Sequence, residues 1–482
     1  MSLFSKGRKY IEGVERPDGK QQRALLHVVL SLAWPMMLEE LVFTLVQYVD
    51  YAMVGSLGVE ATAAVGSTST VNWMIGSSTA ALGVGFVAYI SQAFGAKDEV
   101  RARRASAQSL LVTLVMGVFF TALTLSLSRM VPVWMRVDPA VRDLAAEYFF
   151  ILYTPMLFRT ATTILGRVLA GAGETKLPMK IGIGQNLINV VLNFLMIYET
   201  RQVAVFGLEF TMPGAGLGVR GAAIASAIAI AAGGIMSVIG LLRNKKISPI
   251  GYTMKPDGEI LRPCLRVAVP NMLQRLITSF GYVIFASMIN TIGTIATAAH
   301  TIANTVESAF YIPGYGMQVA AATLTGNAIG ARDRRLQRAQ AGVIITLEIG
   351  LMLVTGGLLF AFAPAMVGIF SSDPEVVGLG STVLRMVALS EPFYGVSIIT
   401  EGMLQGAGRT KMPLVFNIIG MWGVRILGTF ICTQVLGLGL VAAWGCMIAH
   451  NMLLFILFAL YYMRGRWNPL KDGADVSFAA QP

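Results

Sequence analysis

Long apolar runs separated by short polar stretches cover most of this chain. The run Val343–Phe362 carries a single charge, Glu348, and Asn451–Met463 carries none. A helix needs roughly 20 mostly apolar residues to cross a bilayer. The pattern therefore predicts an all-α polytopic membrane protein with 12 transmembrane helices. The expected helices are Leu26–Met53, Ala61–Ala93, Ala107–Leu127, Asp143–Leu169, Met179–Tyr198, Leu217–Leu242, Pro263–Ile289, Ala296–Ala328, Gln340–Ala363, Glu375–Leu404, Pro413–Leu436 and Leu438–Met463.

The apolar pattern occurs twice, at an offset of 235 residues. Matching pairs are Pro35 and Pro270, Asp138-Pro139 and Asp373-Pro374, and Gly171–Pro178 and Gly406–Pro413. Two homologous six-helix bundles in one membrane chain are typical of a transporter, whose site lies where the halves meet. We expect a cytoplasmic tail over residues 1–25, an N-lobe over 26–242, a cytoplasmic loop over 243–262, a C-lobe over 263–463 and a cytoplasmic tail over 464–482.

Basic residues alternate between the loops, as a topology signal does. The segments on one side, both termini included, carry 27 Lys and Arg residues, and the segments on the other side carry 5. We therefore expect both termini in the cytoplasm and two parallel, pseudo-symmetric repeats. Charged residues make up 13% of the chain, against about a quarter in soluble proteins. The net charge of +11 is thus interpreted as topology and not as a nucleic-acid surface.

Two further segments support this picture. The first 24 residues are polar and basic, so we expect no cleavable signal peptide, and the apolar helices predict a location in the plasma membrane. Glu199–Pro213 alternates polar and apolar residues and predicts a short extracellular β-hairpin. The C-terminal half lacks it, because Gly216-Leu217-Gly218 matches Gly437-Leu438-Gly439 at the shorter offset of 221.

One acid stands well along the first helix. Asp50 follows an apolar stretch, and its repeat equivalent is Phe285, so only the N-terminal half requires a carboxylate here. An acid inside a bilayer costs at least ~2.5 kcal/mol and usually has a function. It can take up a proton or pair with a cation, which suits ion coupling. The structural alternative is a hydrogen bond that caps or joins a neighbouring helix.

The fifth helix offers partners for this acid. Asn186, Asn189 and Asn193 lie at i, i+3 and i+7, on one face of a helix. Amide carbonyls are hard oxygen ligands for alkali cations, and the same amides can hydrogen-bond a protonated acid. Amides also join membrane helices without any ligand. The spacing alone leaves both interpretations open.

Other chemistry is excluded by the motifs. The two Gly-Ala-Gly loops lack the order of a Walker motif and are typical of a turn before a proline at the start of a helix. We therefore expect no ATP and an ion gradient as the energy source. The 3 Cys and 3 His residues are too dispersed for a metal cluster. With no nucleophile and base set, we expect neither an enzyme nor a cofactor beyond the coupling ion, Na⁺ or H⁺.

Prolines and aromatic residues complete the candidate features. Pro35 and Pro270 are expected to bend the first helix of each half, and Pro155, Pro313 and Pro392 to interrupt other helices. Aromatic faces attract organic cations. The aromatic residues assigned to a substrate cavity are Tyr48, Trp73, Tyr282, Tyr311 and Tyr394.

The chain resembles the MATE family, the multidrug and toxic compound extrusion transporters, over essentially its whole length. The residues that carry the resemblance are Pro35, Asp50–Gly55, Ser91–Ala96, Gly171–Pro178, Gly406–Pro413 and Gly218–Ala225. The resemblance implies a V-shaped pair of six-helix bundles that exchange organic cations or drugs for Na⁺ or H⁺. It also implies that a first-helix Asp works with polar residues of the fifth and sixth helices. Asp50, Asn189, Asn193 and Ser226 match these positions.

Two departures from the family pattern bear on the ion. Some members carry a second Asp where this chain has Asn193, and the Na⁺-coupled bacterial branch often carries an acid where this chain has Thr278. We therefore expect the cation site in the N-lobe, with Na⁺ as one candidate at Asp50, Asn189 and Asn193. The choice between Na⁺ and H⁺ stays open, as does whether four acids face the cavity: Glu39, Glu40, Glu307 and Glu391.

The alternative function is a flippase for a lipid-linked saccharide or polyprenyl precursor. Such a protein requires a basic cavity for a pyrophosphate. Four arginines inside the apolar pattern could supply it: Arg159, Arg275, Arg385 and Arg425. The drug antiporter remains the first prediction, with small organic cations and membrane lipid as partners, no nucleic acid, and a monomeric chain.

Overall fold

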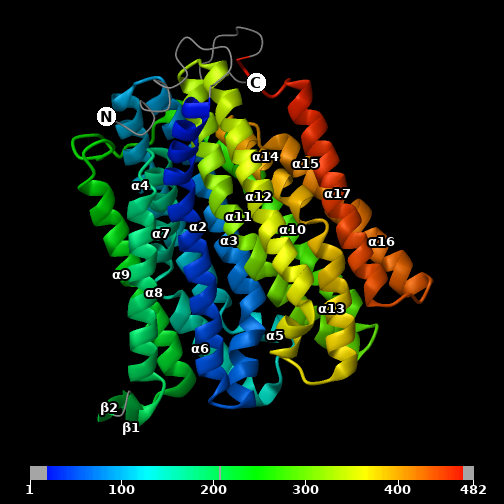
Figure 1. The fold of residues 1–482 in the computed structure, drawn as a ribbon. Helices are drawn as coiled ribbons and strands as arrows, with labels where there is room; N and C mark the ends of the chain where they lie inside the picture. Colours follow the sequence, from blue (N-terminus) through cyan, green and yellow to red (C-terminus); the bar gives the residue numbers. More distant parts are fainter. Residues whose placement is uncertain (1–18, 206–207, 471–482) are drawn as a thin grey trace.

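A computed structural model describes residues 19–205 and 208–470 as a bundle of long helices (Figure 1). The N-half holds eight of the described helices and the hairpin. Its elements are α2 (Gly19–Gly55), α3 (Val59–Gly95), α4 (Glu99–Leu127), α5 (Met130–Trp134), α6 (Pro139–Tyr153), α7 (Met156–Gly171), α8 (Lys176–Met196), β1 (Glu199–Val205), β2 (Leu208–Ala215) and α9 (Gly218–Leu242).

The C-half repeats this order without the hairpin. Its elements are α10 (Gly258–Asn290), α11 (Thr294–Gly330), α12 (Arg334–Gly368), α13 (Pro374–Ala388), α14 (Glu391–Gly406), α15 (Lys411–Ile418), η1 (Ile419–Ile426), α16 (Leu427–Phe430), η2 (Ile431–Val435) and α17 (Leu440–Arg464). The segments η1 and η2 are π-helical, so the span Lys411–Val435 is one helix with two π segments.

The helices agree with the predicted polytopic fold. Eight described helices are long and apolar enough to cross a membrane, and two bent pairs, α6 with α7 and α13 with α14, raise the number to ten. The remaining two predicted spans correspond to α8, with 21 residues, and α11, with 37 residues. Their amides, acids and tyrosines lower the hydropathy of the helices that carry most of the polar chemistry.

Several helices begin earlier than the apolar pattern predicts. The helix expected from Ala107 begins at Glu99, and the one expected from Gln340 begins at Arg334. In each case an aspartate precedes the helix, and its side chain accepts a hydrogen bond from a backbone N–H of the first turn. Apolar runs locate the part of a helix that lies in lipid, whereas these caps set where the helix begins.

The prolines act differently from one another. Pro155 lies at the break between α6 and α7, which are bent by 50°, and Pro392 lies at the start of α14 after a bend of 54°. The expected interruption at Pro313 is wrong, because α11 continues through it. Pro35 and Pro270 likewise lie inside the continuous helices α2 and α10.

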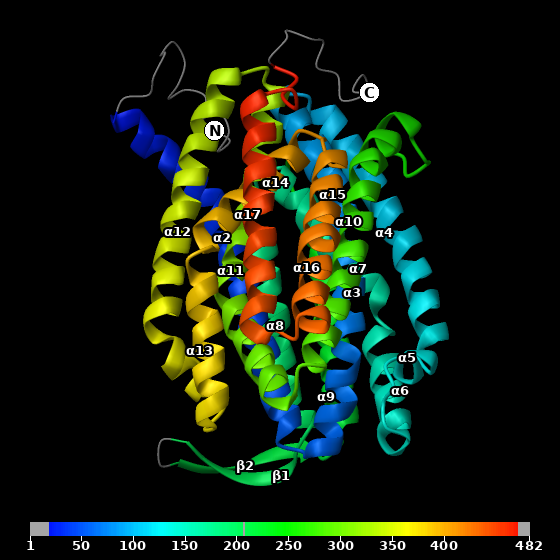
Figure 2. The ribbon, with the colours of Figure 1, turned by 90° about the vertical axis from the view of Figure 1, so that its right-hand side faces the viewer.

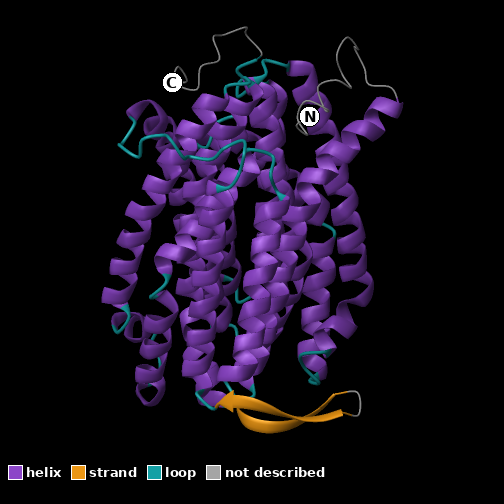
Figure 3. Cartoon of the chain, turned by 90° about the vertical axis from the view of Figure 1, so that its left-hand side faces the viewer, coloured by secondary structure: helices purple, strands orange, loops and turns teal. Residues whose placement is uncertain are grey.

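The predicted hairpin is present. Strands β1 and β2 pair antiparallel, with Gln202 opposite Thr211. The hairpin lies at the end of the bundle opposite to the two ends of the described chain (Figure 2, Figure 3). An even number of spans places both chain ends on the same side, in agreement with this arrangement.

The two halves pack through glycines near the end that holds the chain termini. Gly326 and Gly330 of α11 lie so close to Ser91 and Gln92 of α3 that a Cβ on either glycine would overlap those residues. Every residue of α11 from Gly316 to Ile329 is buried, whereas buried positions in its first half recur on one face. The two halves are therefore closed against each other at the C-terminal ends of α3 and α11.

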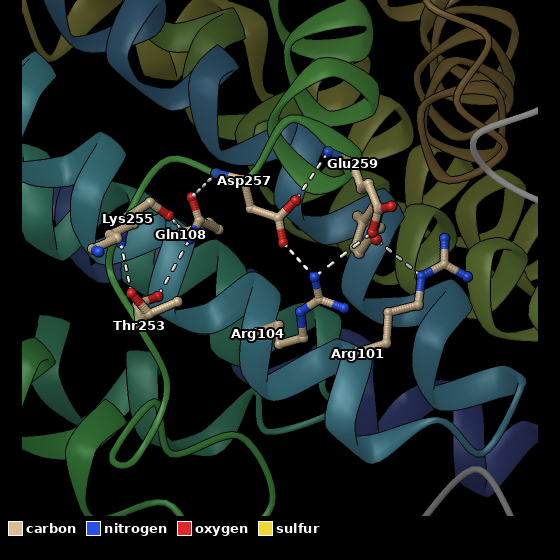
Figure 4. A network of polar contacts seen from close by, with 8 residues as sticks. Arg101, Arg104, Gln108, Thr253, Lys255, Asp257 and Glu259 are labelled. Atoms are coloured by element: carbon tan, nitrogen blue, oxygen red, sulfur yellow. Dashed lines mark hydrogen bonds and ion pairs between the residues drawn. The ribbon is translucent and has the colours of Figure 1, made fainter.

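The connection between the halves is fastened to the N-half (Figure 4). Arg104 of α4 donates to Asp257 at 2.6 Å, and Asp257 caps α10 by accepting from the backbone N–H of Glu259. The Gln108 side chain donates to the carbonyl of Lys255 at 2.8 Å and accepts from the backbone N–H of Asp257 at 3.1 Å. The start of the C-half is thus held at the closed end of the molecule.

Candidate cation-binding site

Three helices of the N-half bring the predicted site residues together. Asp50 lies on α2, Asn189 and Asn193 lie on α8, and Ser226 lies on α9. α8 packs against both α2 and α9. Gly221 of α9 lies against the backbone at Met196, where a Cβ would not fit. Small residues therefore let α9 approach α8 closely enough for short polar side chains to meet.

The Asp50 carboxylate is held by the α8 amides. Asn193 donates from Nδ2 to Asp50 Oδ1 at 2.6 Å. Asn193 is 1% exposed and Asn189 is 5% exposed, while Asp50 is half-buried. A hydrogen bond to an ionised group is shorter and stronger than a neutral one. The contact therefore stabilises the cation-free, anionic form of Asp50.

The Asn189 amide fits between Asp50 and Ser226 in two orientations. With its nitrogen toward Asp50, it donates to both carboxylate oxygens at 2.9 and 3.0 Å and accepts from Ser226 Oγ at 3.0 Å. With the amide reversed, its nitrogen donates to Ser226 Oγ at 3.0 Å and its oxygen faces Asp50. The first orientation suits a carboxylate, and the second suits a protonated Asp50 that donates to the amide oxygen.

The amide oxygens of α8 are the possible cation ligands beside Asp50. The oxygen Asn193 Oδ1 is buried and has no hydrogen-bond partner among the described residues. It could become a cation ligand only if the amide turned and gave up its bond to Asp50. In the described ranges, no group of three His, Cys, Asp or Glu residues could hold a metal ion.

The aromatic residues assigned to a substrate cavity fall into three places. Trp73 of α3 and Tyr282 of α10 form an edge contact across the halves, with ring centroids 6.2 Å apart. Tyr311 and Tyr394 form a similar contact at 5.9 Å inside the C-half. Tyr48 donates to the carbonyl of Thr305 at 3.0 Å and so joins α2 to α11.

Two of the four acids left open by the sequence lie on α2 near Arg167. Glu40 is 4.0 Å from Arg167 and is partly exposed. Glu39 Oε2 is buried without a partner among the described residues, and the Glu39 side chain lies against Gly182 of α8.

The other two belong to a group of buried acids that sequence reasoning missed. Glu307, Glu348 and Glu391 are 5%, 0% and 1% exposed, and they come from α11, α12 and α14. No oxygen of Glu348 or Glu391 has a hydrogen-bond partner among the described residues. Gly314 and Gly395 leave the space for the Glu348 carboxyl group. The available signal was that all three are acids within apolar stretches of the chain.

Glu401 of α14 lies in a network of buried amides. Its carboxylate accepts from Gln274 at 2.9 Å and from Gln405 at 3.1 Å, and both amides are buried. Of the cysteines, Cys264 is buried, while the Cys432 and Cys446 sulfurs lie 3.8 Å apart.

The four arginines of the alternative function have separate environments. Arg159 donates to Asn72 at 2.7 Å, and Arg275 lies 5.7 Å from the Tyr315 ring centroid. Arg385 is exposed beside Phe360. Arg425 is 3% exposed inside the C-half. Each of the four therefore contacts a different set of described residues.

Comparisons with known proteins agree with this architecture. The family model MatE matches two segments, residues 35–195 and 270–431, one in each half. The "Probable multidrug resistance protein NorM" of Thermotoga maritima is 27% identical over 471 residues, which cover 97% of this chain and 96% of the relative.

Solved structures are similar over nearly the whole chain. A crystal structure of a MATE protein in complex with MaD3S is 25% identical, with a TM-score of 0.84, and the match covers 97% of this chain and 99% of that one. The same values hold for a MOP superfamily transporter from Pyrococcus furiosus, for which the reverse polarity of the binding pocket suggests a different function. The overall fold is therefore shared with these structures.

Proposed function

Because this chain belongs to the MatE family of membrane transporters, we propose that it is a secondary active multidrug efflux antiporter. It exports organic cations and other xenobiotics in exchange for a cation that binds at Asp50. The proposal is supported by the match of the family model to both halves and by the multidrug resistance name of the Thermotoga maritima relative. It places the protein in the bacterial inner membrane with both termini in the cytoplasm.

The observation that carries the mechanism is the position of Asp50 between two buried amides. Asn193 holds one carboxylate oxygen at 2.6 Å, and Asn189 can face the same group with either its nitrogen or its oxygen. A cation that neutralises Asp50 weakens the hydrogen bonds that the two amides donate to its carboxylate. α2 and α8 then lose a charge-assisted contact, which changes the preferred position of α2 in the N-half.

The coupling ion that fits best is the proton. Protonated Asp50 needs one reversed amide, whereas Na⁺ needs the oxygens of both Asn189 and Asn193 turned toward it. Ser226 can keep its hydrogen bond to Asn189 in both amide orientations, because a hydroxyl can either accept or donate. No cofactor takes part in this cycle, and the gradient of the ion supplies the energy.

Alternating access between the two halves completes the cycle. The halves are packed closely where α3 meets α11 near the chain termini. With the termini in the cytoplasm, this conformation is closed toward the cytoplasm. Drug is released outside while the cation binds at Asp50, and the closed end then opens for the next substrate molecule. A substrate cation would lie against the exposed ring of Trp73, which approaches Tyr282 across the halves.

The test is ethidium efflux from proteoliposomes with Na⁺ and pH gradients imposed one at a time. Wild type should follow the pH gradient. Asp50→Asn should lose coupled efflux while keeping its membrane insertion and folded yield. The matched control is Glu147→Gln, which removes the charge of an exposed acid of the N-half. Coupled efflux in Asp50→Asn would exclude this mechanism.

A further inference from the structure

The C-half keeps the geometry of the cation site but not its chemistry. Asp50 corresponds to Phe285 at the repeat offset of 235. Ser226 corresponds to Met447, because the sixth helices of the two halves align at an offset of 221. Phe285 lies on α10 and Met447 on α17, and both are buried.

The counterpart of Asn189 is Arg425. Arg425 lies in the π-helical segment η1, and a π-helical turn holds one residue more than an α-helical turn. The repeat offset at the end of η1 is therefore 236, which aligns Arg425 with Asn189.

The contacts of the two residues correspond as well. Asn189 links Asp50, at 2.9 Å, to Ser226, at 3.0 Å. Arg425 links Phe285, whose ring centroid is 4.2 Å from the guanidinium carbon, to Met447, whose sulfur is 2.9 Å from Nη2. Three corresponding helices thus meet through three corresponding side chains in each half.

Arg425 is an unusual residue for such a place. It is 3% exposed, its Nε has no hydrogen-bond partner, and it forms no ion pair within the described parts of the chain. A buried charge in a membrane protein is costly and usually functional. Its positive charge lies over two aromatic faces, Phe285 at 4.2 Å and Tyr282 at 4.7 Å. The pocket is therefore built to hold a cation with rings in place of a carboxylate.

We propose that Arg425 is a tethered cation that permanently fills the C-half counterpart of the cation site. The N-half gains and loses its cation in every cycle, whereas the C-half always keeps its own. Arg425 acts as a positioning residue, because it holds α10, η1 and α17 in one arrangement. It also limits coupling to one ion per cycle, the ion at Asp50. The inference rests on the proposed antiport at Asp50.

The decisive measurement is the coupling stoichiometry of wild type and of a variant with the N-half site rebuilt in the C-half. That variant is Phe285→Asp/Arg425→Asn/Met447→Ser. Proteoliposomes at clamped zero potential are brought to steady state with ethidium over a series of ion gradients. A tenfold ion gradient should sustain about a tenfold ethidium gradient in wild type and about a hundredfold one in the variant, since free energies of coupled ions add.

The outcomes separate the two proposals. An ethidium gradient that ignores the ion gradient in wild type overturns the antiport at Asp50. A hundredfold gradient in wild type means that the C-half already binds a coupling ion, which overturns the role of Arg425. A tenfold gradient in both proteins also overturns it, provided that the variant is folded.

Two single variants keep the inference testable if the rebuilt site does not fold. Arg425→Lys keeps the charge and should retain efflux within about threefold, whereas Arg425→Met should lose about tenfold or more at equal folded yield, because a cation and not volume fills the pocket. The matched control is Arg385→Met, an exposed arginine 5.8 Å from the Phe360 ring centroid, which should match wild type. Wild-type efflux in Arg425→Met contradicts the inference.

Discussion

At the scale of single residues, the amides of α8 decide how firmly Asp50 keeps its negative charge. The Asn193 bond to Asp50, at 2.6 Å, exists in full strength only while Asp50 is anionic. Its loss destabilises the cation-free form and leaves the cation-bound form nearly unchanged. The affinity of the site for its cation is therefore set below its maximum, which allows release on the other side of the membrane.

The variant Asn193→Ala should accordingly bind the coupling cation more tightly. A hydrogen bond to a charged group contributes about 1.5–3 kcal/mol, so the half-saturating ion concentration for efflux should fall about tenfold or more. The measurement is the ion dependence of ethidium efflux. Asn186→Ala serves as control, because Asn186 lies on the same buried face and makes no bond to Asp50. An unchanged or higher half-saturating concentration would contradict the prediction.

Much of this site could be predicted from the sequence, and the reason is helical periodicity. Asn189 and Asn193 share one face of their helix however that helix is rotated about its axis. Asp50 stands out because its repeat equivalent is Phe285, which is not an acid. The sequence did not predict that the buried acids Glu307, Glu348 and Glu391 form a group. They lie on three helices, and the rotation of each helix about its axis depends on packing. Periodicity fixes a face within one helix but not the direction in which that face points.

At the scale of elements, glycines determine how closely helices approach each other, both between the halves and within one half. Gly330 of α11 faces the carbonyl of Gln92 on α3, and Gly406 of α14 faces the carbonyl of Ala322 on α11. These contacts bring backbones together without side chains between them, as is common in membranes. The helices themselves follow from apolar length, but their ends and breaks follow from caps, prolines and the one extra residue of η1.

The variant Gly330→Ala should separate α3 from α11 at the closed end. Its new Cβ would overlap the backbone at Gln92, and overpacking costs about 1–3 kcal/mol of unfolding free energy. Thermal unfolding in detergent measures the loss. The control Gly350→Ala lies on α12 with nothing within 4 Å of its Cβ, and it should be neutral or slightly stabilising because Ala favours helix. Equal unfolding temperatures for both variants would refute this account of the interface.

At the scale of the whole molecule, the connection between the halves belongs to the closed end. Arg104 of α4 pairs with Asp257 at 2.6 Å and Glu259 at 3.7 Å, so the cap of α10 is tied to the N-half (Figure 4). Arg104 is 46% exposed and Asp257 20% exposed. Such an exposed pair contributes at most about 1 kcal/mol. That energy is small compared with the free energy of unfolding of the whole protein. It is large compared with the free-energy difference between two conformations of a transport cycle.

A charge reversal at this pair should therefore change transport more than stability. A shift of about 1 kcal/mol changes a two-state equilibrium about fivefold. Arg104→Glu should alter the efflux rate by up to about fivefold while the unfolding temperature stays near that of wild type. Restoring the pair in reverse, as Arg104→Glu/Asp257→Arg, should recover most of the rate, because the attraction returns although the cap of α10 is lost.

The control for this experiment is a pair within one half. Arg220 and Glu147 lie 2.9 Å apart on the N-half, and their side chains are 62% and 38% exposed. Reversing their charges should leave the efflux rate unchanged. Both residues belong to the N-half, so they keep their relative positions when the two halves move during alternating access. If both pairs changed the rate equally, net charge near the membrane would explain the effect. If the Arg104 variants changed only the unfolding temperature, the pair would stabilise the loop without taking part in access to the site.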